Sequence, residues 1–532
     1  MAAALTAITE HVHFAQTDLV NWTLVTDGSR VMLIDAGFPG QREDVIGSVR
    51  QLGFTVDDIA AVLLTHAHID HSGLLPKLVK DGYSGPIWCT EATADLLEFM
   101  LADSGRIQQA EAERRARRRD RYHDAAVEPL YTEDEALAAW RLARPVPLGE
   151  WFEPVPGLRA RLWNAGHILG SASVELERED VRIMCSGDIG PDNKAFHPDP
   201  DGPRGFDHVI CESTYGNRTR TRATIAERRT ALAGIINEAL ARGGNLVIPA
   251  FALERTQELL LDIAVLSRDG RIGHATAFVD SPLANRATGV FARHLEELED
   301  TGGLDPFRAA AIHYVNDVAE SMRLNTLSGA VILAASGMCE AGRIRHHLFH
   351  NLARRDSTIL FVGFQAEGSL GRVILEGAPR VRISGRDVIV RAQIKRIDSY
   401  SAHADQAELL DWIAARGPIA GSLLLDHGEG EAIEALAELA TRQRLAPAIR
   451  IPEIGEEWEL AKGAPARRLH TGPPEIARAV GRDWQNAYAD LATGLKQRLD
   501  RIRDDAAREA AIAEMRRVLE SYETFRKDRH RS

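Results

Sequence analysis

Metal-binding side chain types crowd into one short stretch that directly follows an apolar run. Residues 62–73 read VLLTHAHIDHSG and place His66, His68, Asp70 and His71 within six positions. Alternate residues of an extended segment point the same way, so His66 and His68 can bind one ion while Asp70 and His71 turn toward another. Imidazole nitrogens and carboxylate oxygens are common zinc ligands. The stretch therefore predicts a metal site where a loop leaves the end of a buried strand.

Three later residues are further candidates, because two metal ions need more ligands than this stretch supplies. His167 stands in NAGHILGSAS, Asp188 in CSGDIG and His427 in LLLDHGE. Each follows an apolar run and has a glycine nearby, as a tight ligand loop requires. Further strand-like runs that end in polar clusters are VMLIDAG (31–37) and PIWCT (86–90). We expect the ends of these strands to gather the ligands at one edge of a rigid sheet.

The order of strand-like and helix-like segments along the chain predicts one domain inserted into another. Apolar runs at 245–251, 276–282, 330–337 and 358–364 alternate with helix-like segments, which is typical of a parallel, Rossmann-like α/β domain. Strands and ligand types return at 396–460. We therefore predict a first domain in two parts, 1–208 and 396–460, an inserted domain at 209–395 and a helical extension at 461–532. The apolar stripe of that extension, beginning at Trp484, predicts amphipathic helices that pack on their own core or form a homodimer contact.

Composition excludes some classes of protein. The 532 residues carry a net charge of −13, which argues against a general nucleic-acid binder but not against a basic cleft. The basic run 114–121, RRARRRDR, predicts either a solvated helix face or a patch that follows RNA. No apolar stretch suits a membrane span, and neither a Walker motif nor GxGxxG after a strand indicates a nucleotide cofactor. Four widely spaced cysteines without a CxxC pair predict free thiols in a reducing cytoplasm.

The ordered motifs resemble a known family. HxHxDH, GHxLGS and SGD, in that order, are typical of the metallo-β-lactamase superfamily, whose fold is an αββα sandwich. CESTYGNR (211–218), PAFALERTQE (249–258), VDSPLA (279–284), SGMCEAGR (336–343), GFQAEGSLGR (363–372), SAHAD (401–405) and HGE (427–429) then resemble its β-CASP branch. That branch contains the nuclease of the cleavage and polyadenylation machinery and bacterial RNase J. The resemblance implies an α/β fold in which the sandwich holds an inserted β-CASP domain.

The resemblance also implies roles for the candidate residues. One metal ion would bind His66, His68 and His167, the other Asp70, His71 and His427, and Asp188 would bridge both. Asp35, in LIDAG, would hold the ligand loop, and Glu212 and His403 would lie beside the scissile phosphate. The implied activity is zinc-dependent hydrolysis of single-stranded RNA by a hydroxide that bridges two metal ions, with manganese as the alternative metal. His403 would act as general acid, and Glu212 would orient its imidazole.

Four residues of the inserted domain are predicted to bind RNA. They stand just past strand ends, where backbone amides and guanidinium groups suit phosphates. These residues are Arg255, Ser336, Arg343 and Arg372. Each arginine taken alone is more often part of a surface ion pair.

The first 50 or so residues depart from the β-CASP pattern. The segment HVHFAQTDLVNWTLVTDGSRVMLIDAGFPGQ is more similar to single-domain metallo-β-lactamase hydrolases, many of which act on small molecules. A small-molecule ester or thioester hydrolase is therefore the alternative function. A non-catalytic RNA-binding scaffold is a third reading, although no predicted ligand is missing. The sequence leaves open endonuclease against exonuclease action, RNA specificity and oligomeric state.

Overall fold

The computed structural model describes most of the chain from residue 5 to residue 470. The exceptions are 10–11, 17–20, 27–29, 40–41, 52, 120–127, 221–222, 274, 367 and 453–456, and beyond 470 only 504, 507, 510–511, 513–515 and 517 are described.

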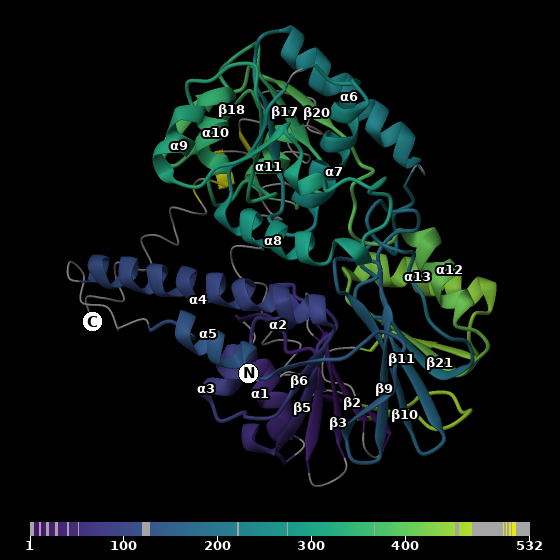
Figure 1. Ribbon diagram of the computed structural model, residues 1–532. Helices are drawn as coiled ribbons and strands as arrows, with labels where there is room; N and C mark the ends of the chain where they lie inside the picture. The colour runs from purple at the N-terminus through teal and green to yellow at the C-terminus, as the bar shows by residue number, and fades with distance from the viewer. Residues whose placement is uncertain are drawn as a thin grey trace.

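Two seven-stranded sheets face each other and form a sandwich (Figure 1). The first sheet follows chain order, antiparallel up to its fourth strand and parallel afterwards. It contains β1 (Leu5–Thr9), β2 (Val12–Gln16), β3 (Asn21–Thr26), β4 (Val31–Ile34), β5 (Ile59–Leu63), β6 (Ile87–Cys89) and β7 (Ala143–Pro145). The second sheet contains, in spatial order, β22 (Ala448–Arg450), β21 (Ile419–Asp426), β12 (Phe206–Glu212), β11 (Val181–Cys185), β10 (Ala172–Arg178), β9 (Leu158–Asn164) and β8 (Phe152–Val155).

Apolar residues fill the space between the two sheets and the space under the helices outside them. Leu63 and Ile34 of the first sheet share a buried cluster with Val174 and Leu424 of the second. The helices that follow the strands of the first sheet are α1 (Arg42–Gln51), α2 (Ile69–Ser72), α3 (Leu75–Lys80), α4 (Glu91–Arg119) and α5 (Glu133–Trp140). The second sheet is covered by α12 (Gln406–Ala415) and α13 (Gly430–Gln443). The layers are therefore helix, sheet, sheet, helix, as predicted.

A separate lobe lies against one end of the sandwich (Figure 1). Its six-stranded parallel sheet has the order β15 (Ile312–Tyr314), β14 (Ala277–Val279), β16 (Val331–Ala334), β13 (Leu246–Pro249), β17 (Thr358–Phe361) and β20 (Gln393–Arg396). Its helices are α6 (Ile225–Ala241), α7 (Arg255–Arg268), α8 (Pro282–Arg293), α9 (Val318–Leu324), α10 (Ile344–Asn351) and α11 (Leu370–Leu375), and β18 (Arg380–Ile383) pairs with β19 (Arg386–Ile389). This arrangement is the predicted insertion of a Rossmann-like α/β unit.

The connections between the two units differ in detail from the predicted boundaries. Strand β12 pairs with β11 and β21, so the sandwich continues through Glu212, beyond the predicted boundary at 208. The region predicted to become helical at 461 first forms β24 (Arg467–His470), which pairs with β23 (Glu457–Glu459). This strand lacks the helical periodicity that begins at Trp484, and that stripe lies outside the described residues.

Two further expectations concern the helices. The basic run 114–121 begins within α4, and most of its side chains lie outside the described residues. None of the described helices combines the length and apolar character that spanning a membrane requires.

Candidate active site

Asp35 holds the histidine-rich loop at both of its ends. It follows β4 and has a positive φ of 60°, which aims its side chain across to the end of β5. Its Oδ1 accepts a hydrogen bond from the backbone N–H of Thr65 (2.9 Å), and its Oδ2 lies 2.8 Å from Nδ1 of His71. The carboxylate therefore fixes where the loop starts and how the His71 ring is turned.

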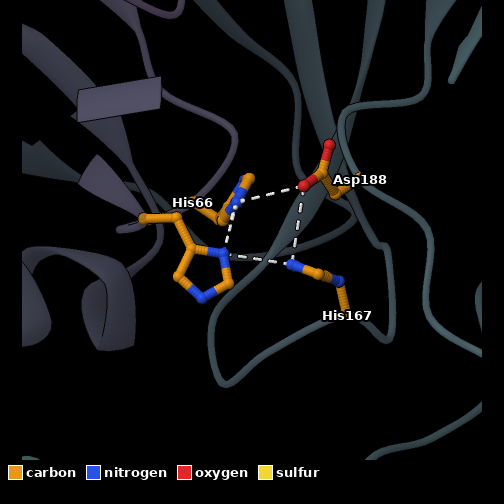
Figure 2. A group of neighbouring side chains, drawn as sticks. His66, His167 and Asp188 are labelled. Atoms are coloured by element: carbon orange, nitrogen blue, oxygen red, sulfur yellow. Dashed lines mark hydrogen bonds and ion pairs between the residues drawn. The ribbon is translucent and has the colours of Figure 1, made fainter. Parts of the chain in front are cut away.

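The first ligand group, His66, His68, His167 and Asp188, gathers four donor atoms at one point. Nδ1 of His68 lies 3.1 Å from Nε2 of His66 and 3.1 Å from Nε2 of His167. Both Nε2 atoms lie 3.6 Å from Oδ2 of Asp188. Figure 2 shows His66, His167 and Asp188 pointing toward one another, as side chains around a shared ion do.

The outer nitrogens of two of these rings, His66 and His167, are held by the protein. Nδ1 of His66 lies 3.0 Å from the hydroxyl of Thr65, and Nδ1 of His167 lies 2.9 Å from the carbonyl oxygen of Ala402. Burial lowers the pKa of His66 and of His167 well below the usual value for histidine. The rings are therefore neutral, which is the form of imidazole that binds metal.

The second ligand group, Asp70, His71 and His427, lies on the other side of Asp188. Nε2 of His71 and Nδ1 of His427 each lie 3.5 Å from Oδ1 of Asp188. The two oxygens of one buried carboxylate therefore face different groups of imidazoles. His427 follows β21 at a positive φ of 44°, which turns the chain sharply at this point.

The two groups fit divalent cations. Nε2 of His71, Oδ1 of Asp188 and Nε2 of His427 are buried and have no hydrogen-bond partner among the described residues. Buried polar atoms nearly always have a partner, so three orphaned atoms of ligand type in one place require an explanation. All three belong to the second group or to the Asp188 oxygen that faces it, where one cation would partner them. For the first group the support is the close approach of its four donor atoms, which are the nitrogen and carboxylate oxygen that suit zinc.

His403 lies next to the ligand groups without belonging to the two sets above. Its Nε2 lies 3.9 Å from Oδ2 of Asp188, and its Nδ1 lies 3.2 Å from Oε1 of Glu212. Glu212 is buried and accepts hydrogen bonds from the backbone N–H groups of Ile189 (2.6 Å) and Thr214 (3.2 Å). Burial by itself would lower the pKa of His403, but Glu212 and Asp188 raise it above its usual value. The site thus combines His66 and His167, whose pKa values burial lowers, with His71 and His403, whose pKa values neighbouring carboxylates raise against the effect of burial.

Family models match three parts of the chain. Residues 15–223 match the metallo-beta-lactamase superfamily, 256–374 the Beta-Casp domain and 387–450 the Zn-dependent metallo-hydrolase RNA specificity domain. Ribonuclease TTHA0252 of Thermus thermophilus is 35% identical over 426 residues, which cover 78% of this chain and 92% of that protein. The chain belongs to the β-CASP family. The first match begins at residue 15, so most of the N-terminal segment that departs from the β-CASP pattern matches the metallo-beta-lactamase superfamily.

Other relatives of this β-CASP protein are longer than the matched region. Transcription termination factor FttA is 31% identical over 427 residues in Cenarchaeum symbiosum and 32% identical over 425 residues in Methanothermobacter thermautotrophicus. These matches cover 77% and 76% of the chain. The chain spans 63% and 64% of the length of those two relatives.

The residues predicted to bind RNA in this β-CASP protein are dispersed. Arg255 lines a cavity of about 450 Å³ that also contains His68, Asp188 and His403, which we call the active-site cavity. The other three do not line it. Ser336 bonds within its own loop to Ala341, Arg343 lies 2.5 Å from Asp280, and Arg372 lies 2.7 Å from Glu376.

Other residues of the active-site cavity were not among the predicted binding residues. Tyr215, Arg218, Phe251 and Phe364 line it, and Phe251 is 47% exposed although it is a large apolar side chain. All four stand within motifs that carry the family resemblance. These residues could therefore have been found from the sequence as aromatic residues or arginines within a motif that also supplies a predicted site residue, as CESTYGNR supplies Glu212.

Proposed function

We propose that this protein is a metal-dependent ribonuclease that hydrolyses phosphodiester bonds of single-stranded RNA. The observation that carries the proposal is the shared carboxylate of Asp188, which faces one ligand group with each oxygen while His403 lies beside it. The ribonuclease relative and the match to an RNA specificity domain support RNA as the substrate. The small-molecule hydrolase is not favoured, because the similarity to the ribonuclease extends through the lobe as well as the sandwich.

The first ligand group and the second would each hold one divalent cation, with Asp188 shared. Bound there, the cations supply an activated water at neutral pH and positive charge against the phosphoryl oxygens. The donor set is rich in histidine, which favours zinc, with manganese as the alternative. Asp35, Thr65 and Ala402 would keep the ligand rings in place, because each contacts a ring nitrogen that faces away from the site.

His403 would donate a proton to the oxygen that leaves phosphorus. His403 lines the active-site cavity with Asp188, its Nε2 lies 3.9 Å from Oδ2 of Asp188, and Glu212 contacts the opposite nitrogen. A carboxylate in that position fixes the ring orientation and stabilises the imidazolium. A positioned proton donor typically contributes about 10²–10⁴-fold to a rate.

We also propose a cytoplasmic location, a domain division and a homodimer contact for this protein. All four cysteines are buried and unpaired, which supports a reducing cytoplasmic environment. The chain would divide into domains at 1–208, 209–395, 396–460 and 461–532, with β12 continuing the sandwich to Glu212 and β24 preceding the helical part of the extension. A homodimer contact through the helical extension is part of the same proposal.

The proposal is tested by offering the purified chain three substrates. End-labelled single-stranded RNA, labelled DNA of the same sequence and a chromogenic ester are each incubated with and without a chelator. Cleavage of RNA that the chelator abolishes is the expected result, and the product ladder then shows which end or interior bond is attacked. Ester hydrolysis without RNA cleavage would replace the ribonuclease with the small-molecule hydrolase.

A further inference from the structure

Arg218 presents a guanidinium group that is oriented by aromatic rings and lacks an anionic partner. Its guanidinium carbon lies 4.5 Å from the ring centre of Phe364 and 5.3 Å from that of Tyr215. No carboxylate of the described residues lies within ion-pair distance of it. Its neighbours differ in this respect, since Arg220 is paired with Glu408 and Arg228 with Asp262. Stacking on rings orders the planar group while its N–H edges stay available.

Arg255 is a second cation with unused donors in the same cavity. It is 7% exposed, and its Nε and Nη1 are buried without a hydrogen-bond partner. The nearest carboxylate, Glu258, lies 3.9 Å from Nε, too far for a hydrogen bond. Unpaired donors on a buried guanidinium are costly, and Glu258 does not satisfy them at this distance, so an acceptor that enters the cavity would lower that cost.

The two arginines come from different parts of the structure and border one space. Arg218 lies between β12 and α6, whereas Arg255 begins α7 of the lobe. Both line the active-site cavity with Asp188 and His403. Arg218 also lines a neighbouring cavity of about 1150 Å³, so it stands where the two spaces adjoin.

We propose that Arg218, together with Arg255, binds the backbone phosphate next to the scissile one. This inference rests on the proposed function. A phosphodiester offers two non-bridging oxygens that match the paired N–H groups of a guanidinium. The scissile phosphate belongs at Asp188 and His403, which leaves the adjacent phosphate for the arginine wall of the same cavity. Arg218 would thereby set the path of the strand from the active-site cavity into the larger one.

The test combines a protein variant with a change to one phosphate of the RNA. Arg218→Gln keeps hydrogen-bonding capacity but removes the charge, and Arg442→Gln is the matched control. Arg442 pairs with Glu438 on the exposed surface of α13 and lines neither cavity. The RNA carries a single neutral methylphosphonate linkage on one side or the other of the mapped cleavage position. Binding is measured by fluorescence anisotropy in the His403→Ala background, so that cleavage does not consume the ligand.

We expect Arg218→Gln to weaken RNA binding about tenfold or more, as loss of a charged hydrogen bond does, and Arg442→Gln to leave it unchanged. One neutral linkage beside the cleavage position should lower the RNA affinity of the protein that retains Arg218 by a similar factor. The same linkage should lower the affinity of Arg218→Gln little further. The slope of log affinity against log salt should fall by about 0.7, the value for one phosphate contact on a single strand.

Two results would overturn the inference. One is an unchanged affinity for RNA in Arg218→Gln. The other is that the fold-loss of affinity from Arg218→Gln and the fold-loss from the neutral linkage multiply fully, whichever side of the cleavage position carries the linkage, because the two changes then act independently. Arg218→Lys guards against a folding artefact, because it keeps the charge and should bind more tightly than Arg218→Gln if the phosphate contact is real. RNA that binds in an Arg218-dependent way but is never cut by the wild-type chain would remove the proposed function alone.

Discussion

At the scale of single residues, the site depends on side chains whose two polar atoms have different neighbours. Asp188 offers each oxygen to a different ligand group, and His71 contacts Asp35 with one nitrogen while the other stays open. His403 is similar, because its Nδ1 contacts Glu212 while the residue also lines the active-site cavity. Such arrangements fix a ring before any ligand arrives, which lowers the cost of reaching a reactive geometry.

Glu212→Gln tests whether this backing matters for catalysis. The amide keeps the shape of the side chain but loses the charge that stabilises the His403 imidazolium. We expect metal content to stay at the wild-type level and the single-turnover rate on RNA to fall by about 10–100-fold, part of the usual value of a proton donor. Glu177→Gln, on the surface of β10 and paired with Arg159, is the control that should keep the full rate. Loss of metal in Glu212→Gln would instead identify Glu212 as a ligand.

The grouping of the candidate metal ligands could be predicted because each of them depends on local sequence. An apolar strand followed by histidine or aspartate next to glycine places that side chain at a strand end, and the structure brings all seven predicted ligands to one edge. Arg343 could not be predicted in this way, because its partner Asp280 is distant in the chain and only the folded lobe brings the two together. The stacking of Arg218 on Phe364 could not be predicted for the same reason, since the two residues belong to different motifs.

At the scale of elements, the loop that carries His403 is tied to helices of the lobe. This loop runs from β20 to α12, and the buried hydroxyl of Tyr400 donates a hydrogen bond to Asp262 of α7 (2.7 Å). Asp262 also accepts from Arg228 (2.9 Å) and Arg229 (2.7 Å) of α6. Two helices and the loop therefore meet at one buried carboxylate.

Tyr400→Phe removes only the hydroxyl from this junction. Because a buried hydrogen bond to a charged acceptor is lost, we expect the free energy of unfolding to fall by about 1–3 kcal/mol. Urea denaturation measures this change through the midpoint at constant slope. Metal content should not change, since neither ligand group contacts Tyr400. An unchanged midpoint would mean that the junction does not stabilise the loop.

The strand β24 shows where periodicity fails to predict an element. The sequence from 461 is rich in proline and glycine near its start, and the helical stripes that follow it predict that it belongs to the extension. Four residues were too few to reveal alternation, and the partner strand β23 supplies the hydrogen bonds that define β24. The parallel strands of the lobe were predictable because each is an apolar run between helix-like segments.

At the scale of the whole molecule, a buried ion group joins the sandwich to the lobe. Glu254, at the start of α7, lies 2.7 Å from Nζ of Lys194 and 2.8 Å from Nε2 of His197, both between β11 and β12. Burial would raise the pKa of Glu254, but His197 and Lys194 hold it well below the usual value. Lys194 also donates to the carbonyl oxygen of His167 (2.7 Å), so the junction lies directly behind a candidate metal ligand.

Glu254→Gln should therefore destabilise the chain far more than a change at the surface of the same junction. Removing one partner of a buried ion pair costs about 3–5 kcal/mol, because the remaining charges stay buried. Asp95→Asn is the control, since Asp95 of α4 is 33% exposed and pairs across the same two units with Arg293, which is 56% exposed, and with His294. Ion pairs open to solvent contribute about 0–1 kcal/mol. Equal losses for the two variants, measured by urea unfolding, would show that burial of Glu254 does not matter.

The central claim is a site in which Asp188 binds both cations and His403 moves a proton without binding either. The most direct measurement pairs metal content with the single-turnover rate of RNA cleavage for Asp188→Ala and His403→Ala. The wild-type chain should hold about two divalent ions, and Asp188→Ala should lose metal and activity together. His403→Ala should keep its metal and lose about 10²–10⁴-fold in rate. Metal loss in His403→Ala, or a full rate with full metal, would contradict the account.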